Sequence, residues 1–487
     1  MQAVKAKRGI KTQIETRFWP IGLCLVAIGV VARLWNLRNA PGWEWDEVVY
    51  GNIAHNLYEG GQMVAKTEYL SQPEPYLYHP PFYFHLLARW FELVDSGVTQ
   101  GRVLAVAGAA VTMLLLLALL RRVIGEAWAL AGVGLIAVDT WLNFSQRVGW
   151  IENTMIPIGV LGLLLYVIAL EKNRWWWYAG AGFFLGSAAV YKHIGFIFVG
   201  VLVIYAILFR ENWRKNLLAL GAAFLTILSY ALMAMLVYGP VFVNATVVQF
   251  LRSAGEKASS GALTSLEDVI SPLVGQYRIY VATVVLAAVA VILVVYRLGQ
   301  IIVHKGNTDK VRPIGILYAW ALAAVVFFLG LQLRFPHYSM LAFIPLFCYL
   351  VAEVSMIRLT ARRSIAIGVV GVLVLVANIF AFNARFVSPE HDSALRDVQQ
   401  FATTNMPLDA KVIADESTGT VIPQPFCVMW RGASCTGATY IIVYTSSTQH
   451  LENNYGQQEL IDSGTEVFST TGYKETIVIY QLAEAIP

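Results

Sequence analysis

Charged residues are scarce in this chain. They make up 14% of its 487 residues, whereas hydrophobic residues make up 57%, and the mean hydropathy is +0.59. A water-soluble domain cannot bury so large a share of apolar side chains, so the composition excludes an ordinary soluble protein and predicts a polytopic membrane protein. The net charge of +4 is too small to favour nucleic acid as a partner.

Cysteine is also rare, and the four that are present do not follow the CxxC spacing of a zinc site. Cys24 and Cys348 fall inside apolar stretches, where core packing is expected. Cys427 and Cys435 fall in the C-terminal tail, where a disulfide is plausible in an oxidising compartment. The sequence leaves open whether that bond forms. The chain also lacks an internal repeat and a glycine-rich nucleotide-binding fingerprint.

Long apolar runs dominate what is present. A hydrocarbon layer about 30 Å thick needs roughly 20 apolar residues per helix. The sequence therefore predicts about eleven transmembrane helices, at 18–37, 102–120, 127–144, 154–170, 175–191, 194–209, 216–237, 277–296, 313–331, 338–356 and 364–383. No small-x-small cleavage site precedes Arg33, so the first span is expected to be a retained helix and not a removed signal peptide.

Basic residues predict the orientation of the spans. Five Lys and Arg residues precede the first span, and further clusters fall in alternate connections, such as 121–122 and 297–312. The positive-inside rule then places the N-terminus in the cytoplasm. With eleven spans, the tail from residue 384 lies outside.

The connections divide the chain into a transmembrane domain over residues 1–383 and a small extracytoplasmic α/β domain over 384–487. The first outer loop, 39–101, contains amphipathic stretches at 47–59 and 81–94, which lie on the membrane, pack on the bundle, or do both. A second outer loop, 238–276, carries a Ser/Gly-rich stretch at 253–265 that suits either a lid or a linker.

The tail itself shows a helical pattern at 394–403 and a second at 453–463. Three short runs rich in β-branched residues predict strands at 411–414, 440–444 and 476–480.

The candidate catalytic residues are two adjacent carboxylates in the first outer loop, Asp46 and Glu47. Like charges side by side raise one another's pKa and can divide the roles of base and partner. A solvated loop pair is the alternative explanation. Trp43, Trp45 and Tyr50 favour function, because they place the acids at the membrane interface.

Further polar clusters are predicted at the same outer face. Arg147 suits a phosphate, and Glu152 suits a metal or a supporting role. The alternative explanation of any one cluster is an interfacial anchor or a side chain that snorkels to water. Several on one face favour a shared cavity; the cationic and aromatic members are Arg147, Lys192, His193, Arg334, His337 and Tyr338.

The order of these motifs resembles a known group of enzymes. The relevant segments are Trp45-Asp46-Glu47 with Tyr50, then His79-Pro80-Pro81-Phe82-Tyr83, Gly101-Arg102-Val103, Ser145-Gln146-Arg147 with Glu152, Tyr191-Lys192, and Arg334 to Tyr338 with Pro345. Together they resemble the protein O-mannosyltransferase and aminoarabinose-transferase group of the glycosyltransferase-C superfamily, over about residues 18–383. One departure is Gln146, which separates a serine and an arginine that are often adjacent in the family.

The resemblance implies a membrane glycosyltransferase that uses a polyprenyl-phosphate-linked sugar and transfers it, with inversion, to a hydroxyl of a protein, glycolipid or polysaccharide. Asp46 would be the general base, with Glu47 beside it. The donor phosphate would meet Arg147, Lys192 and Arg334, with His193, His337 and Tyr338 nearby. Glu152, Tyr50 and His79 would support the site. A divalent cation (Mg, Mn or Zn) held by Glu47 or Glu152 is a further expectation.

Two other classes compete with this prediction. A transporter or flippase of lipid-linked sugars usually carries its charges near the bilayer midplane, whereas here they cluster at one face. A receptor or adhesion protein would act through the tail alone, so deleting residues after about 390 would remove its activity.

Overall fold

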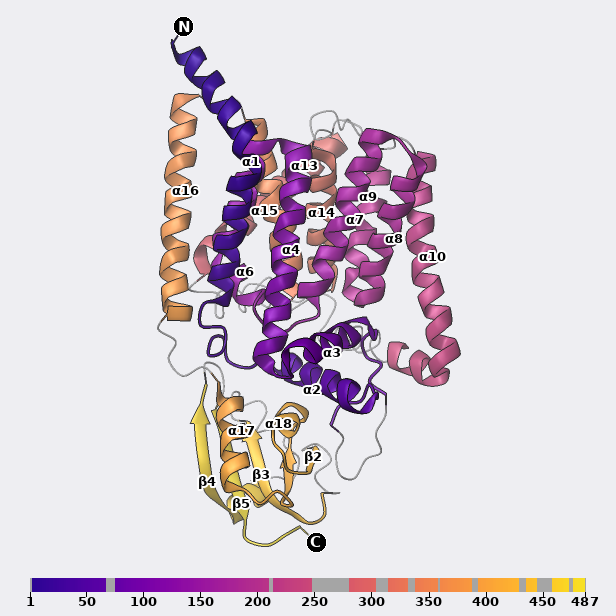
Figure 1. Ribbon diagram of the computed structural model, residues 1–487, viewed down its shortest axis with the longest axis vertical. Helices are drawn as coiled ribbons and strands as arrows, with labels where there is room; N and C mark the ends of the chain where they lie inside the picture. Colours follow the sequence, from indigo (N-terminus) through magenta and orange to yellow (C-terminus); the bar gives the residue numbers. More distant parts are fainter. Residues whose placement is uncertain are drawn as a thin grey trace.

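The computed structural model describes residues 2–66, 75–209, 213–247, 280–303, 314–331, 338–357, 360–387, 393–428, 435–444, 458–472 and 476–486. Long helices run side by side in a bundle, two shorter helices cross its lower end, and a small domain containing a β-sheet lies below them (Figure 1).

Every predicted span contains a helix. These helices are α1 (Gln2–Leu34), α4 (Val98–Ile124), α5 (Glu126–Val138), α6 (Thr140–Ser145), α7 (Glu152–Lys172), α8 (Trp175–Tyr191), α9 (Phe196–Phe209), α10 (Trp213–Tyr238), α13 (Val281–Val303), α14 (Gly315–Leu331), α15 (Ser339–Met356) and α16 (Ala361–Phe382). In the described part of the chain, seven helices are long and apolar enough to cross a membrane, and three shorter helices are also apolar. The membrane-protein class is thus supported, while eleven crossings stay a prediction.

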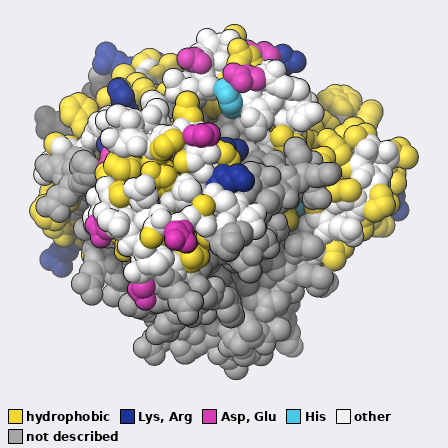
Figure 2. All heavy atoms as spheres, turned by 90° about the horizontal axis from the view of Figure 1, so that it is seen from below, with side chains coloured by type: hydrophobic (Ala, Val, Ile, Leu, Met, Phe, Trp, Pro, Cys, Tyr) yellow, Lys and Arg dark blue, Asp and Glu magenta, His cyan; other side chains and the backbone are white. Residues whose placement is uncertain are grey.

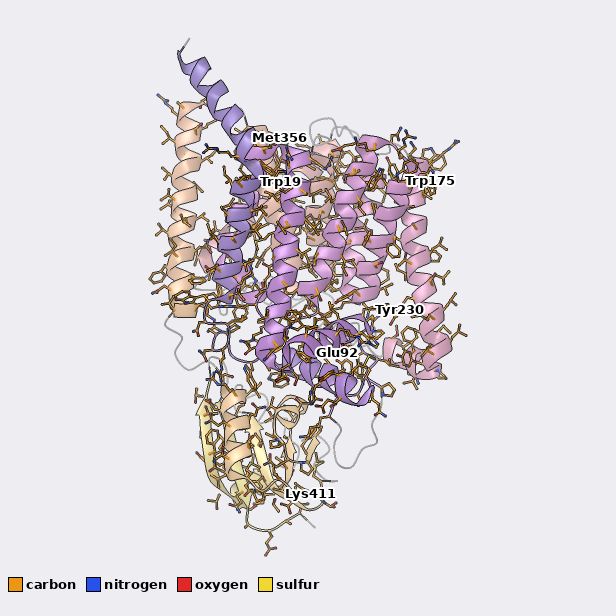
Figure 3. The ribbon with its side chains drawn as sticks, viewed as in Figure 1. Trp19, Glu92, Trp175, Tyr230, Met356 and Lys411 are labelled. Atoms are coloured by element: carbon orange, nitrogen blue, oxygen red, sulfur yellow. A yellow bond between two sulfur atoms is a disulfide. The ribbon has the colours of Figure 1, made fainter. Side chains whose placement is uncertain are left out.

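The bundle has a protein core and an apolar periphery. α7 and α15 are mostly buried, whereas α10 and α16 expose most of their apolar surface. Trp19 and Trp175 lie at the upper end and Tyr230 toward the lower end (Figure 3), the arrangement of interfacial aromatic belts. The apolar periphery is therefore the surface that would contact lipid.

Small residues bring α8 and α10 close together. A Cβ added to Gly182 would lie 2.0 Å from the carbonyl oxygen of Ala219, so only glycine permits this approach. Such contacts let membrane helices pack by dispersion forces, since no hydrophobic driving force exists between helices in lipid.

The first outer loop forms the two predicted amphipathic helices. They are α2 (Trp45–Gly60) and α3 (Phe82–Val94), and they cross the lower end of the bundle (Figure 1). Tyr50 and Ile53 of α2 and Phe84 and Leu87 of α3 are buried. Part of each helix thus packs on protein, which fits two of the options that the sequence left open: packing on the bundle, and packing on the bundle while also lying on the membrane.

The C-terminal part is a mixed α/β unit, as predicted. Its sheet has the strand order β2-β1-β3-β5-β4, formed by β2 (Phe426–Val428), β1 (Lys411–Ala414), β3 (Ala438–Tyr444), β5 (Thr476–Leu482) and β4 (Gly464–Thr471). β1 pairs in parallel with β2 and β3, while β5 pairs antiparallel with β3 and β4. The helices are α17 (Ala394–Asn405), α18 (Glu416–Val421) and α20 (Gln458–Ser463).

The three predicted strands coincide with β1, β3 and β5, and the predicted helix 394–403 with α17. α20 matches the second half of the predicted helix 453–463, whose residues 453–457 lie outside the described residues. The prediction missed β2 and β4. β2 has only three residues, and β4 contains three threonines, a serine and a glycine, so neither has a long β-branched apolar run. The face seen from below mixes acidic, basic, apolar and neutral side chains (Figure 2).

Lys66 connects the first outer loop to the C-terminal domain. Its Nζ donates hydrogen bonds to the carbonyl oxygens of Gly419, Ile422 and Gln424, at 3.1, 2.5 and 2.8 Å. Burial lowers the pKa of Lys66 to about 8. Val48 of α2 also packs into the core of this domain. The domain is therefore docked directly on the helix that carries Asp46.

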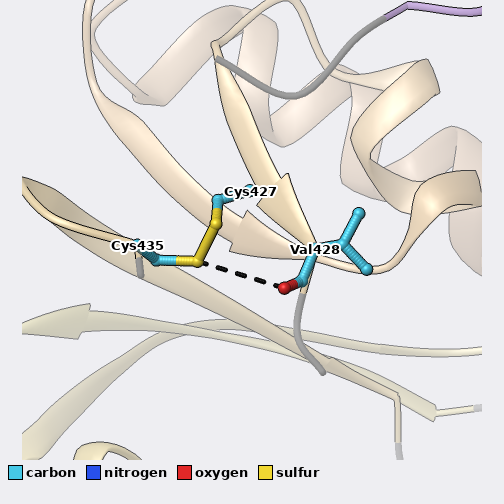
Figure 4. Close-up of a disulfide and its surroundings, with 3 residues drawn as sticks. All are labelled: Cys427, Val428 and Cys435. Carbon is cyan, nitrogen blue, oxygen red and sulfur yellow. Dashed lines mark hydrogen bonds between the residues drawn. A yellow bond between two sulfur atoms is a disulfide. The ribbon is translucent and has the colours of Figure 1, made fainter. Parts of the chain in front are cut away.

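A disulfide joins Cys427 and Cys435, which answers the question that the sequence left open (Figure 4). The Cα atoms are 5.8 Å apart, within the range that a disulfide requires. The bond links the middle residue of β2 to the segment just before β3.

Replacing both of these cysteines with serine should lower the free energy of unfolding of the C-terminal domain by about 2.5 kcal/mol, because the bond closes a loop of about nine residues in the unfolded chain. Differential scanning calorimetry with and without reductant measures the effect. A wild-type transition that is insensitive to reductant, with both thiols open to labelling, would show that the bond does not form.

Candidate functional site

The two candidate carboxylates occupy the first turn of α2, where negative charge favours the helix dipole. Successive helical residues point about 100° apart, so Asp46 and Glu47 face different surroundings. Glu47 is 4% exposed and Asp46 is half-buried. The main-chain N–H of Glu44 donates to Oε1 of Glu47 at 2.9 Å, which fixes the start of the helix.

Glu47 pairs with Arg102 of α4. The guanidinium binds both carboxylate oxygens, and Nε lies 3.0 Å from Oε2. Oε2 also accepts a hydrogen bond from the main-chain N–H of Gly149 at 3.0 Å. Arg102 further donates to the carbonyl oxygens of Leu37 and Pro41. Glu47 thus joins α2, α4 and the loop before α7.

A second buried ion pair lies between α7 and the turn after α8. Nζ of Lys192 is 2.7 Å from Oε1 of Glu152, and the two residues are 3% and 0% exposed. Tyr191 donates to Oγ1 of Thr154 at 2.9 Å, which holds the ends of α7 and α8 together. In the described part of the chain, Oε2 of Glu152 has no hydrogen-bond partner.

Asp46 lies within electrostatic range of this pair. Burial by itself would lower the pKa of Lys192, but the negative potential of Glu152, Tyr338 and Asp46 outweighs it and raises that pKa above its usual value. Lys192 also lies over the ring of Tyr338, 5.4 Å from its centroid. The fold therefore gathers Asp46, Glu152, Lys192 and Tyr338 from four separate segments.

Aromatic side chains of the first outer loop form a wall beside this group. The rings of Tyr50 and His79 lie edge to face at 5.7 Å, and Tyr50 contacts Tyr83 at 5.8 Å. Burial and the charge of Asp46 raise the pKa of Tyr50 well above its usual value, so its hydroxyl stays protonated. Tyr83 donates to the carbonyl oxygen of Gly149 at 2.7 Å.

Arg147 belongs to a different cluster. Its Nε and Nη2 donate to the carbonyl oxygen of Arg33 at 3.1 and 2.9 Å, and its guanidinium lies 4.1 Å from the ring centroid of Phe386. Burial, followed by the positive charges of Arg102, Arg33 and Arg385, lowers the pKa of Arg147 to about 9. Nη1 of this fully buried side chain has no hydrogen-bond partner among the described residues. Its binding of a donor phosphate stays a prediction.

The other predicted site residues are only partly described. His193 is half-buried and opens the short 3-10 turn η1 (His193–Gly195) directly after Lys192. Arg334 and His337, like the Ser/Gly-rich stretch 253–265, lie outside the described residues. Their predicted roles are untested.

Sequence reasoning missed Arg33 and the partnership of Arg102. Arg33 is fully buried and donates to the carbonyl oxygens of Ile136 and Ala137 at the end of α5. Its Nη2 also lies 2.6 Å from Oε1 of Gln146. Because Arg33 provides hydrogen-bond donors for these carbonyl oxygens, the predicted span 127–144 can break at Asp139 into α5 and α6. A lone arginine within an apolar span was the available signal.

The two predicted metal ligands each have a cationic partner: Arg102 for Glu47 and Lys192 for Glu152. Nowhere in the described ranges do three His, Cys, Asp or Glu side chains come together as a metal site. A cation on Glu47 would have to displace Arg102, whereas Oε2 of Glu152 has no hydrogen-bond partner among the described residues. Metal dependence is untested.

Arg102→Leu should lower the free energy of unfolding by about 3–5 kcal/mol, because it leaves the Glu47 carboxylate buried and unpaired. The double change Glu47→Gln with Arg102→Leu should recover part of that loss. As a control, Arg89→Leu breaks an exposed pair with Glu92 and should cost less than about 1 kcal/mol. Thermal unfolding in detergent checks all three; equal losses for Arg102→Leu and Arg89→Leu would contradict the assignment.

Comparison with known proteins adds two findings. Residues 78–238 match the family model of dolichyl-phosphate-mannose-protein mannosyltransferases. The fold is similar to that of ArnT from Cupriavidus metallidurans bound to undecaprenyl phosphate, with a TM-score of 0.62 and 14% identity over 94% of this chain and 97% of that chain. A search of curated protein sequences gives no match.

A second similar structure is the archaeal oligosaccharyltransferase AglB from Archaeoglobus fulgidus, in complex with an inhibitory peptide and a dolichol-phosphate. Its TM-score is 0.56, with 12% identity over 88% of this chain and 69% of that chain. At these identities the likeness shows a shared fold. Together with the family match, it confirms the resemblance to membrane glycosyltransferases of the glycosyltransferase-C superfamily that the sequence motifs predict.

Proposed function

We propose that this protein is an integral membrane glycosyltransferase that moves a sugar from a polyprenyl-phosphate donor to an acceptor hydroxyl at the outer membrane face, with inversion. The observation that carries the proposal is the buried Glu152–Lys192 pair at the lower end of the bundle, with the Asp46 carboxylate within electrostatic range of it. A carboxylate and a cation, brought together where apolar helices end, suit a ligand with a lipid tail and a phosphate head.

In the proposed reaction, the Asp46 carboxylate takes the proton of the acceptor hydroxyl. The acceptor oxygen attacks the anomeric carbon of the donor from the side opposite the phosphate. A new glycosidic bond forms while the bond between the anomeric carbon and the phosphate oxygen breaks, and its electron pair leaves with polyprenyl phosphate. Because this leaving group is a stabilised anion, no strong general acid is required.

Lys192 would stabilise the charge that grows on the leaving phosphate. Buried charges act strongly there because little water screens them. Glu152 would keep Lys192 in place in the absence of donor. The protonated hydroxyl of Tyr50 would donate a hydrogen bond to a sugar or phosphate oxygen. Glu47 would hold the start of α2, and so Asp46, in position, since Arg102 and Gly149 already bind its oxygens. No step requires a metal ion.

The disulfide supports an outward-facing C-terminal domain, because such bonds persist in oxidising compartments. In that orientation Asp46 lies at the outer face, since the domain docks on α2. The lipid phosphates named with the two similar structures, undecaprenyl phosphate and dolichol-phosphate, support a polyprenyl donor. The acceptor hydroxyl would belong to a protein, a glycolipid or a polysaccharide.

Asp46→Asn should lower sugar transfer by about 10²–10⁴-fold, because it removes the general base and keeps the side-chain shape. The assay follows release of polyprenyl phosphate from a panel of polyprenyl-phosphate sugars, with the protein in nanodiscs. Asp95→Asn, an exposed change in the same outer loop, is the matched control and should keep wild-type rates.

Wild-type rates in Asp46→Asn would refute the proposed base. Movement of a labelled donor across the bilayer, with no chemical change by the wild-type protein, would instead favour a flippase.

The double change Glu152→Gln with Lys192→Met removes both charges of the second pair and leaves no unpaired ion. We expect the protein to fold and transfer to fall at least about 10²-fold, since the cation that stabilises the leaving phosphate is lost. Rates and thermal unfolding are measured side by side. Undiminished transfer by a folded double variant would exclude Lys192 from the reaction.

A further inference from the structure

A cleft on the C-terminal domain remains unexplained by the transfer reaction. It has a volume of about 430 Å³ and lies between α17 and the edge strand β4. α17 and β4 lie next to one another in the lower domain, below the bundle (Figure 1). None of its lining residues belongs to the group around Asp46, so the cleft is distinct from that group.

The floor of the cleft is aromatic. Phe401 of α17 and Phe468 of β4 stack with their ring centroids 4.5 Å apart and their planes 22° apart. Both rings are half-buried and pack against the core of the domain, next to buried Val398 and Ala402. The rings are thus held rigidly from below, so ordering them on binding would cost little entropy.

The rim of the cleft is polar and neutral except for one carboxylate. Asp397, Gln400 and Thr404 follow one another at helical spacing on a single face of α17. Asp397 Oδ2 accepts a hydrogen bond from the hydroxyl of Thr470 at 2.9 Å, which ties the helix to the strand. The amide of Gln400 and the hydroxyl of Thr404 are exposed beside the rings.

This combination defines the chemistry of a ligand. None of the eight lining residues is basic, and Nε of the neighbouring Arg396 already faces Oδ1 of Asp397 at 4.0 Å, so no lining residue offers a cation to a phosphate or a carboxylate. A single carboxylate, already bonded to Thr470, is too few ligands for a metal ion. Aromatic rings accept the apolar C–H face of a sugar ring, while amide, hydroxyl and carboxylate groups bond to its hydroxyls. A neutral sugar satisfies both requirements.

We propose that the α17–β4 cleft binds a neutral saccharide. The proposal goes beyond the transfer reaction, since it concerns binding at a site that holds no group assigned to catalysis. A saccharide-binding site on this domain would suit a ligand or acceptor that carries a glycan.

The test measures saccharide binding to the full-length protein in lipid nanodiscs, because sugar-based detergents would compete. Saturation-transfer NMR is run with a panel of glucose, galactose, mannose, arabinose, N-acetylglucosamine, maltose and cellobiose. We expect binding of at least one of them. Gln400→Ala should weaken it about tenfold, the effect of losing one hydrogen bond of about 1.4 kcal/mol.

Gln399→Ala is the matched control, because the same change falls one residue away and outside the cleft. It should leave binding unchanged. Thr404→Arg, which places a long side chain over the floor, should abolish binding. Calorimetry confirms that each variant keeps the transition of the C-terminal domain.

The proposal is overturned if no sugar of the panel binds. It is equally overturned if binding is the same in wild type, Gln400→Ala and Thr404→Arg, since the sugar would then lie elsewhere. Gln400→Ala and Thr404→Arg should release polyprenyl phosphate from the donor at the wild-type rate, because the cleft holds no group assigned to catalysis. This result separates the cleft from the reaction site, so either proposal can fail without the other.

Discussion

Glu47 and Arg102 bury opposite charges where the first outer loop meets α4, and the position of Asp46 depends on this pair. Removing two ions from water costs several kcal/mol per ion, which only close pairing and further hydrogen bonds offset. Arg102 meets that requirement by also binding main-chain carbonyls of residues 37–42, and Glu47 by accepting the N–H of Gly149. The start of α2 is thereby fixed to the bundle, and with it the neighbouring Asp46, which lies within electrostatic range of Lys192.

The same principle recurs across the lower end of the bundle. Glu152 with Lys192 joins α7 to the turn after α8, and Arg33 satisfies the last carbonyls of α5. Each of these contacts connects segments that would otherwise end in lipid or at its surface. A site built from paired charges is rigid before the donor arrives, which is the condition for stabilising charge in a transition state without reorganising the protein.

Much of the fold was predictable because the physical signals are local. A run of apolar residues predicts a helix in any membrane protein, and β1, β3 and β5 each contain a β-branched run. The candidate acids and Lys192 were also recognisable as charges between spans. Pairings were not predictable, because Glu47 and Arg102 are 55 residues apart in sequence and only the packed bundle brings them together. For the same reason, the sequence did not show that Arg102 and Gly149 bind the oxygens of Glu47, and a catalytic role of Glu47 stays a prediction. The break at Asp139 depends on Arg33 of another helix, which no local pattern reveals.

The most direct test of this account is a cryo-EM structure of the protein in nanodiscs with a polyprenyl phosphate. We expect the phosphate to contact Nζ of Lys192 and the polyprenyl chain to leave the site between helices into the bilayer. The Asp46 carboxylate should face the phosphate, with room for one sugar between them. A phosphate bound at the opposite end of the bundle, near Arg297 and Glu353, would contradict it.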